Sequence, residues 1–194
     1  MKIGILGIQG DVDLHREKLE EAGLDWCIVK KAHELEGIDG FILPSGESTT
    51  ISKMLERYNM NKVLKEKIVD GLPVLATCAG TVLLASRIED GEEEISPLGI
   101  LSIKIKRNAY GRQRESFEVP LKINLGGREE KIVGVFIRAP KIVEFWNGVD
   151  VLGTFEESPV MVKQGKIIAM TFHPELSDGV AVYKFFEEII KGSV

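Results

Sequence analysis

The stretch from Gly71 to Thr81 constrains the fold of this chain more than any other. It begins with the apolar run Val74-Leu75-Ala76 and continues through Cys78 and small residues into an apolar pattern of helical spacing. This order predicts a strand, a sharp turn and a helix, as in the Gly-x-Ser-x-Gly elbow of esterases, with sulfur in place of the hydroxyl. A corner residue of this kind adopts a strained backbone conformation, so its neighbours must be small.

The corner position makes Cys78 a candidate nucleophile. Free N–H groups and the positive end of the helix dipole would favour its thiolate over its thiol. The alternative is that Cys78 is a small buried hydrophobic residue, which is the usual fate of a free cysteine. This stretch alone leaves both interpretations open.

Length and charge narrow the class of protein. The 194 residues carry a net charge of −5, and 44% of them are hydrophobic. They suit a single domain spanning residues 1–194, and the negative charge argues against nucleic acid or anionic membranes as partners. The two cysteines are too few for a disulfide framework, and no apolar run approaches the ~20 residues of a membrane helix. Because the N-terminus enters a strand without a signal peptide, we expect a cytoplasmic protein.

Apolar runs alternate with amphipathic stretches in the first half of the chain. The predicted strands are Lys2–Leu6, Leu24–Val29, Gly40–Leu43 and the run before Cys78. The predicted helices follow Asp11, Ser48, Asn61 and Cys78. This alternation predicts a parallel sheet with right-handed crossovers, which binds ligands at the carboxyl ends of its strands. The loops Gly7–Gly10 and Pro44–Ser48 and the elbow emerge there, although the glycine spacing of the first loop does not match a dinucleotide site.

The second half of the chain has a different pattern. An acidic stretch at 89–94, expected to be an exposed loop, precedes several strand-like pieces: Leu98–Lys106, Phe117–Ile123, Lys131–Ile137, Val160–Val162 and Lys166–Thr171. Their close spacing and glycine-containing turns favour antiparallel pairing. A last helix follows Ser177-Asp178. We therefore expect an α/β domain of three layers, in which a mostly parallel central sheet is flanked by helices and gains antiparallel strands in the C-terminal half.

A thiolate nucleophile needs a base and a group that orients the base. His15 lies in an amphipathic helix and His33 in a polar connection, so both are expected on the surface. His173 follows a predicted strand, which places it at the same rim of the sheet as the elbow. Pro174 favours an extended backbone at His173, so Glu175 can lie beside the imidazole. The alternative is an exposed histidine at a helix-entry turn.

The oxyanion of an amide substrate needs N–H donors. One would come from Ala79, after the candidate nucleophile, and another from the loop Pro44–Ser48, where Gly46 permits a close approach; the alternative is an ordinary strand-to-helix turn. Arg107 and Arg138 each follow a predicted strand and suit a substrate carboxylate, although surface arginines are common. The three histidines and two cysteines lack zinc-ligand spacing, so we expect no metal.

Cys78 in an elbow, followed far downstream by His-x-Glu, resembles the triad-type (class I) glutamine amidotransferases. Several segments, in the family's order, more narrowly resemble the glutaminase subunit of the two-component pyridoxal 5′-phosphate synthase. These segments are Gly-Ile-Gln-Gly-Asp (7–11), Leu-Pro-Ser-Gly-Glu-Ser-Thr-Thr (43–50), Ala-Thr-Cys-Ala-Gly (76–80), Arg-Asn-Ala-Tyr-Gly-Arg-Gln (107–113), Ser-Phe-Glu (116–118), Phe-Ile-Arg-Ala-Pro (136–140) and Phe-His-Pro-Glu-Leu (172–176). The Arg-Asn-x-x-Gly-Arg-Gln and Phe-Ile-Arg-Ala-Pro segments are the specific ones.

The resemblance implies a glutaminase with a Cys-His-Glu triad. Cys78 would attack the side-chain amide of L-glutamine and form a thioester, His173 would protonate ammonia and then activate water, and Glu175 would orient His173. The residues that the resemblance assigns to glutamine binding are Gly46, Glu47, Ser48, Arg107, Ile137 and Arg138. Gln9 would sense a partner near the oxyanion site.

The resemblance also implies a partner and no cofactor. Ammonia would pass to a synthase subunit that builds the pyridoxal ring from ribose 5-phosphate and glyceraldehyde 3-phosphate, in a large hetero-oligomer with a dodecameric core. The alternatives are an amidotransferase subunit or amide hydrolase of another pathway, or a non-catalytic regulatory subunit. Ser45 and Ala76 stand where the family usually has glycine. Serine costs more than glycine at positive φ, whereas Ala76 adds only a methyl group, so we expect the elbow to survive.

Overall fold

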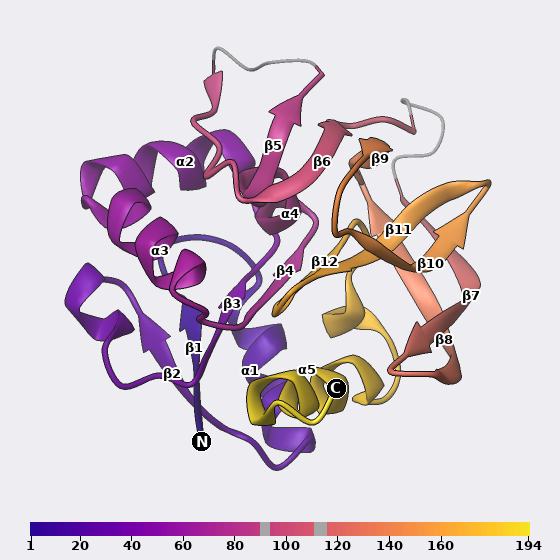
Figure 1. The fold of residues 1–194 in the computed structure, drawn as a ribbon, viewed down its shortest axis with the longest axis horizontal. Helices are drawn as coiled ribbons and strands as arrows, with labels where there is room; N and C mark the ends of the chain where they lie inside the picture. Colours follow the sequence, from indigo (N-terminus) through magenta and orange to yellow (C-terminus); the bar gives the residue numbers. More distant parts are fainter. Residues whose placement is uncertain (90–93, 111–115) are drawn as a thin grey trace.

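The protein is described here from a computed structural model that covers residues 1–89, 94–110 and 116–194. Most of the acidic stretch at 89–94 therefore lies outside the described residues, as do residues 111–113 of the Arg107 segment. Helices lie on both sides of a large twisted sheet (Figure 1). Among the described residues, no helix has the length and apolar character needed to cross a membrane.

The helices and strands alternate in the first half, and strands dominate the second. The helices are α1 (Val12–Glu21), α2 (Ser48–Arg57), α3 (Met60–Val69), α4 (Ala79–Leu84) and α5 (Ala181–Lys191), with 3₁₀ turns η1 (Ala32–Leu35) and η4 (Pro174–Leu176). The first six strands are β1 (Lys2–Leu6), β2 (Asp25–Val29), β3 (Gly40–Leu43), β4 (Val74–Thr77), β5 (Ala85–Ile88) and β6 (Leu101–Lys106). They are followed by β7 (Ser116–Leu125), β8 (Arg128–Ile137), β9 (Lys141–Phe145), β10 (Asp150–Phe155), β11 (Ser158–Gln164) and β12 (Ile167–Met170).

The central sheet of the described chain has nine strands in the order β2-β1-β3-β4-β12-β11-β10-β7-β8. The pairs from β2 to β12 are parallel, and those from β12 to β8 are antiparallel. A smaller sheet, β5-β6-β9, lies beside it. The expected α/β class and the antiparallel strands of the C-terminal half are therefore confirmed.

The buried parallel strands send alternate side chains to opposite faces of the sheet, as a two-residue repeat requires. Phe41 and Leu43 pack in one apolar cluster with residues of α2, α3, α4 and the small sheet. Ile42, between them in sequence, packs in a second cluster with residues of α1 and α5. These two clusters bury both faces of the sheet and produce the three layers visible in Figure 1.

Three strands differ from expectation. The apolar pattern of helical spacing after Cys78 continues through Ala85, but Ala85 begins β5. Leu98 N and Ile100 N donate to the carbonyls of Leu83 and Leu84 at 2.7 and 3.0 Å and take the acceptors that end the helix. The sequence pattern also did not predict β9 and β10. Their pairing is tertiary: β9 pairs with the distant β6, and the register of β10 is irregular around Gly153.

Candidate active site

The elbow at Cys78 is the most constrained turn of the site. Cys78 joins β4 to α4 with φ 44° and ψ −101°, a left-handed conformation that is costly for a residue with a side chain. Its N–H donates to the Met170 carbonyl at 2.9 Å, and the Thr81 hydroxyl donates to the same oxygen at 2.7 Å. A Cβ at Gly80 would overlap the Leu43 carbonyl, so glycine is required there. The predicted strand–turn–helix is therefore present, with Ala76 accommodated in β4.

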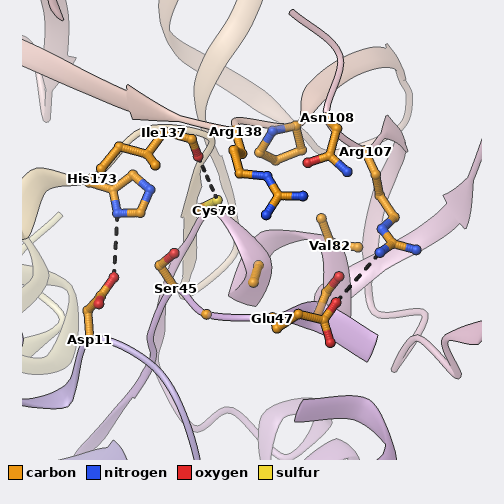
Figure 2. A pocket seen from close by; sticks show the side chains of 14 residues that line it. Asp11, Ser45, Glu47, Cys78, Val82, Arg107, Asn108, Ile137, Arg138 and His173 are labelled. Carbon is orange, nitrogen blue, oxygen red and sulfur yellow. Dashed lines mark hydrogen bonds and ion pairs between the residues drawn. The ribbon is translucent and has the colours of Figure 1, made fainter. Parts of the chain in front are cut away.

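His173 reaches the elbow because its strand is a neighbour of β4. Strands β4 and β12 are parallel and pair Thr77 with Met170, so their carboxyl ends meet at one rim. His173 has the extended backbone expected before Pro174, φ −108° and ψ 91°, and its N–H donates to the Val135 carbonyl at 2.8 Å. Figure 2 shows its imidazole beside the Cys78 sulfur, and both residues line one pocket. The exposed-histidine alternative is excluded, because His173 is buried.

Glu175 lies directly behind the imidazole. Its Oε1 is 2.8 Å from His173 Nδ1, and both side chains are buried. Burial alone would raise the pKa of Glu175, but interactions with His15 and with His173 outweigh it and lower the pKa. The carboxylate is therefore ionised and can hold the Nδ1–H of the imidazole, leaving Nε2 on the side of Cys78.

The electrostatics of the site favour a charged imidazole beside Cys78. Burial alone would lower the pKa of His173, yet the neighbouring sulfur of Cys78 and the hydrogen-bonded carboxylate of Glu175 raise it to about 10. This balance corresponds to an imidazolium held by the Glu175 carboxylate. A thiolate is the form of cysteine that attacks a carbonyl carbon.

Asp11 is a site residue to which the sequence assigned no catalytic or binding role, although it lies in the segment 7–11. It holds the N-cap position of α1 without a side-chain capping bond, and its Oδ2 lies 3.8 Å from His173 Nδ1 (Figure 2). Burial, followed by the charge of Glu175, raises the pKa of Asp11. Ligand atoms of Asp11, His173 and Glu175 lie within 4.8 Å of one another, which is close enough to surround a cation. However, Nδ1 already donates to Glu175, so a cation would compete with that hydrogen bond.

His15 corrects another expectation, because it is fully buried rather than on the surface. Its Nδ1 lies 2.9 Å from the Tyr183 hydroxyl, and its Nε2 lies 3.3 Å from Thr77 Oγ1 and 3.7 Å from Glu175 Oε2. Helical spacing could have indicated this burial, since His15 precedes the buried Leu19 by one turn and lies on the same face of α1. His33, by contrast, is exposed as expected.

The loop from Pro44 to Ser48 packs on the loop Gly7–Gly10. Asp11 N donates to the Ser45 carbonyl at 3.1 Å, and Glu47 N donates to Gln9 Oε1 at 3.0 Å. Ser45 is buried and does not adopt a positive φ, so serine carries no left-handed strain there. Gly46 lies so close to Gln9 that a Cβ would overlap the amide oxygen. The expected oxyanion donor Gly46 and the expected partner sensor Gln9 are thus in direct contact.

The candidate substrate residues lie around a pocket of about 300 Å³ with Cys78 at its base. Its lining is Asp11, Ser45, Gly46, Glu47, Ser48, Cys78, Ala79, Val82, Arg107, Asn108, Ile137, Arg138, Pro140 and His173. All six glutamine-binding candidates and Ala79 are in this set. The structure adds Val82, Asn108 and Pro140 to the predicted set. Val82 lies in α4, Asn108 follows Arg107, and Pro140 ends the segment 136–140.

Two arginines lie on the side of the pocket opposite His173 (Figure 2). Arg107 contacts Thr49 Oγ1 at 3.3 Å and Glu47 Oε1 at 3.7 Å. Arg138 follows β8 with φ 44°, a sharp turn that aims its guanidinium into the pocket. The carbonyl oxygen of Ile137, just before this turn, lies 4.0 Å from Cys78 Sγ. The pocket therefore combines cations with Asp11 and Glu47, which suits a zwitterionic ligand.

Comparisons with known proteins agree with this geometry. A model of the SNO glutamine amidotransferase family matches residues 5–191. The proteins named pyridoxal 5′-phosphate synthase subunit PdxT from Thermotoga petrophila and Thermotoga neapolitana are each 50% identical over 191 residues, covering 98% of this chain and 100% of each relative. A solved glutamine amidotransferase matches with a TM-score of 0.91 and 40% identity, over 97% of this chain and 98% of that one. The resemblance inferred from the sequence is confirmed, and the chain belongs to the SNO glutamine amidotransferase family.

Proposed function

We propose that this chain is the glutaminase subunit of a pyridoxal 5′-phosphate synthase and hydrolyses L-glutamine to L-glutamate and ammonia. The observation that supports it most strongly is that Cys78 and His173 line one pocket, with the Glu175 carboxylate 2.8 Å from His173 Nδ1 behind it. The family match and the two PdxT relatives support the substrate and the pathway. We also propose that residues 1–194 form one domain. The cytoplasmic location of the protein remains a prediction.

The reaction proceeds through a thioester. The Cys78 thiolate attacks the side-chain amide carbon of glutamine, and the N–H groups of Gly46 and Ala79 stabilise the oxyanion. The imidazolium of His173 gives its proton to the departing nitrogen, so ammonia leaves and a γ-glutamyl thioester remains. Neutral His173 then takes a proton from water, which attacks the thioester and releases glutamate and the thiolate. Glu175 holds the imidazole in place throughout.

The rest of the pocket holds the amino-acid end of glutamine. Arg107 and Arg138 bind the α-carboxylate, because paired N–H donors match two carboxylate oxygens. Glu47, Ser48 and the Ile137 carbonyl offer oxygen acceptors to N–H groups of the substrate. Together these contacts place the side-chain amide over the sulfur.

Ammonia passes to a synthase partner in a large hetero-oligomer. Gln9 suits the role of partner sensor because its side chain contacts the Glu47 N–H, next to the proposed oxyanion donor Gly46. A partner that moved Gln9 would change the geometry of this loop. The activity of the chain is therefore expected to rise when the partner binds.

The test is glutamate release by the chain mixed with a cognate synthase, with Cys78→Ala compared with the wild type. We expect Cys78→Ala to lower the rate roughly 10⁴-fold or more while the fold and partner binding persist. Cys27→Ala is the matched control, because Cys27 lies in β2 away from the pocket and should leave the rate unchanged. An undiminished rate in Cys78→Ala would refute the proposal. A preference for asparagine or a peptide amide over glutamine would assign the same machinery to another substrate.

A further inference from the structure

A second histidine adjoins the triad, and the mechanism above does not use it. His15 is fully buried on α1, and its Nε2 lies 3.7 Å from Glu175 Oε2. Glu175 therefore has an imidazole on each side: Oε1 contacts His173 Nδ1 at 2.8 Å, and Oε2 faces His15. Among the described residues, Oε2 has no hydrogen-bond partner within the usual distance, and His15 Nε2 is a side-chain nitrogen that faces it.

His15 connects this carboxylate to the strand that carries the nucleophile. Its Nε2 lies 3.3 Å from Thr77 Oγ1, and Thr77 immediately precedes Cys78. Its Nδ1 lies 2.9 Å from the hydroxyl of Tyr183 on α5. One side chain thus contacts the strand before the elbow, the 3₁₀ turn that holds Glu175, and the last helix.

The hydroxyl of Tyr183 is a donor from which Nδ1 of His15 can accept a hydrogen bond. Burial and the charge of Glu175 raise the pKa of Tyr183 well above its ordinary value, so the hydroxyl stays protonated and can donate to Nδ1. Burial, outweighing the pull of Glu175, lowers the pKa of His15, so its ring is neutral. A neutral ring that accepts at Nδ1 carries its proton on Nε2, which faces Thr77 Oγ1 and Glu175 Oε2.

We propose that His15 is a positioning residue for the triad: its Nε2–H, oriented by Tyr183, holds the Glu175 carboxylate in place and keeps it charged. The role rests on the proposed function, because it concerns how Glu175 supports His173. It matters most after ammonia has left, when His173 has given up its proton and Glu175 no longer faces a cation. A buried carboxylate without a donor at that stage would take up a proton and release the imidazole.

The groups that act on this carboxylate come from every element around it. His15 faces it from α1, His173 from the end of β12, Tyr183 from α5 and Asp11 from the loop before α1. Neither Asp11 nor Tyr183 can offset the negative charge of Glu175, since Asp11 is itself an acid and the Tyr183 hydroxyl is engaged with His15. Among these described side chains, His15 is therefore the one other than His173 that can donate to Glu175.

Two readouts test the proposal on His15→Leu, His15→Gln and Tyr183→Phe. The first is kcat and KM for glutamine with the synthase partner. The second, which needs no turnover, is the pH profile of Cys78 alkylation by iodoacetamide, followed by peptide mass spectrometry so that Cys27 serves as an internal reference. His33→Gln is the matched control, because His33 is exposed and remote from Glu175.

We expect His15→Leu to lower kcat roughly 10- to 100-fold with KM little changed, because His15 does not line the pocket. A misplaced Glu175 supports the imidazolium less, so Cys78 alkylation at slightly acidic pH slows and its midpoint moves to higher pH. His15→Gln should recover much of the activity, since its amide N–H can occupy the place of Nε2–H. Tyr183→Phe should shift both readouts in the same direction as His15→Leu, and His33→Gln should match the wild type.

A wild-type kcat and alkylation profile in His15→Leu, or no recovery by His15→Gln, would overturn the proposal. Circular dichroism shows whether His15→Leu folds. If it does not, Tyr183→Phe becomes the deciding variant, because it removes one oxygen and keeps the ring. An unshifted Cys78 alkylation profile in Tyr183→Phe would then overturn the proposed role of His15. Failure of the proposed function has a different signature. Glutamine hydrolysis would survive in Cys78→Ala, while the alkylation profile would still report on His15.

Discussion

His173 determines the charge balance of the pocket. Burial of its imidazole opposes the charged form, but the sulfur of Cys78 and the carboxylate of Glu175 on its two sides raise its pKa to about 10. The contacts that keep the imidazole charged therefore also stabilise the folded state. Asp11, at 3.8 Å from the same ring, adds a further negative charge.

The free energy of unfolding should consequently decrease at alkaline pH. A pKa raised from 6.5 to about 10 contributes stability that is complete below pH 6.5 and is lost as the pH rises through 10. Urea unfolding followed by tryptophan fluorescence across this range should show the decline. Glu175→Gln removes one of the interactions that raise the pKa, so its curve should be flatter. Parallel curves for the two proteins would contradict this interpretation.

The elbow element owes its shape to backbone contacts between neighbouring segments. Helix α4 begins so close to β3 that the Gly80 position has no room for a side chain beside the Leu43 carbonyl. Because the obstacle is backbone within a sheet, it cannot move aside as a side chain can.

Gly80→Ala is therefore expected to destabilise the fold by about 1–3 kcal/mol and to displace Cys78, with a loss of glutaminase activity beyond the loss of folded protein. Gly40→Ala is the matched control on β3. Its new methyl group would meet the end of the Ile190 side chain at 2.6 Å, and that flexible side chain can rotate. Thermal unfolding and glutaminase assays on both variants measure the difference. An equal or larger effect of Gly40→Ala would refute the argument.

The whole molecule is organised by one sheet that joins the two ends of the sequence. Strand β12 pairs with β4 from residues 167–170 to 74–77, and α5 covers the same face as α1. The site lies at this junction, since Cys78 follows β4 and His173 follows β12. Neither half of the chain can complete the rim that holds the nucleophile and base.

We therefore expect residues 1–194 to unfold in one cooperative transition. Calorimetry should give a calorimetric enthalpy equal to the van't Hoff enthalpy, and Trp26 and Trp146, which lie in different halves, should report the same midpoint. Two separate transitions would instead show that the parallel and antiparallel parts of the sheet are independent folding units.

The sequence alone determined the features that depend on nearby residues. The strand–turn–helix at Cys78, the extended backbone of His173 before Pro174, and the first β–α alternation all follow from local sterics and spacing. They were sufficient to predict the α/β class and to name Cys78, His173 and Glu175. The segments shared with the family added Glu47, Ser48 and Ile137, which line the pocket together with Gly46, Arg107 and Arg138.

Tertiary structure alone decided the rest. Helical spacing puts His15 on the buried face of α1, but its partners Glu175, Thr77 and Tyr183 come from other parts of the chain. The same is true of Asp11, which points to His173 instead of capping its helix, and of β9, which exists because β6 lies beside it. Hydrogen bonds and charges between residues remote in sequence leave no periodic pattern, so they appear only once the chain has folded.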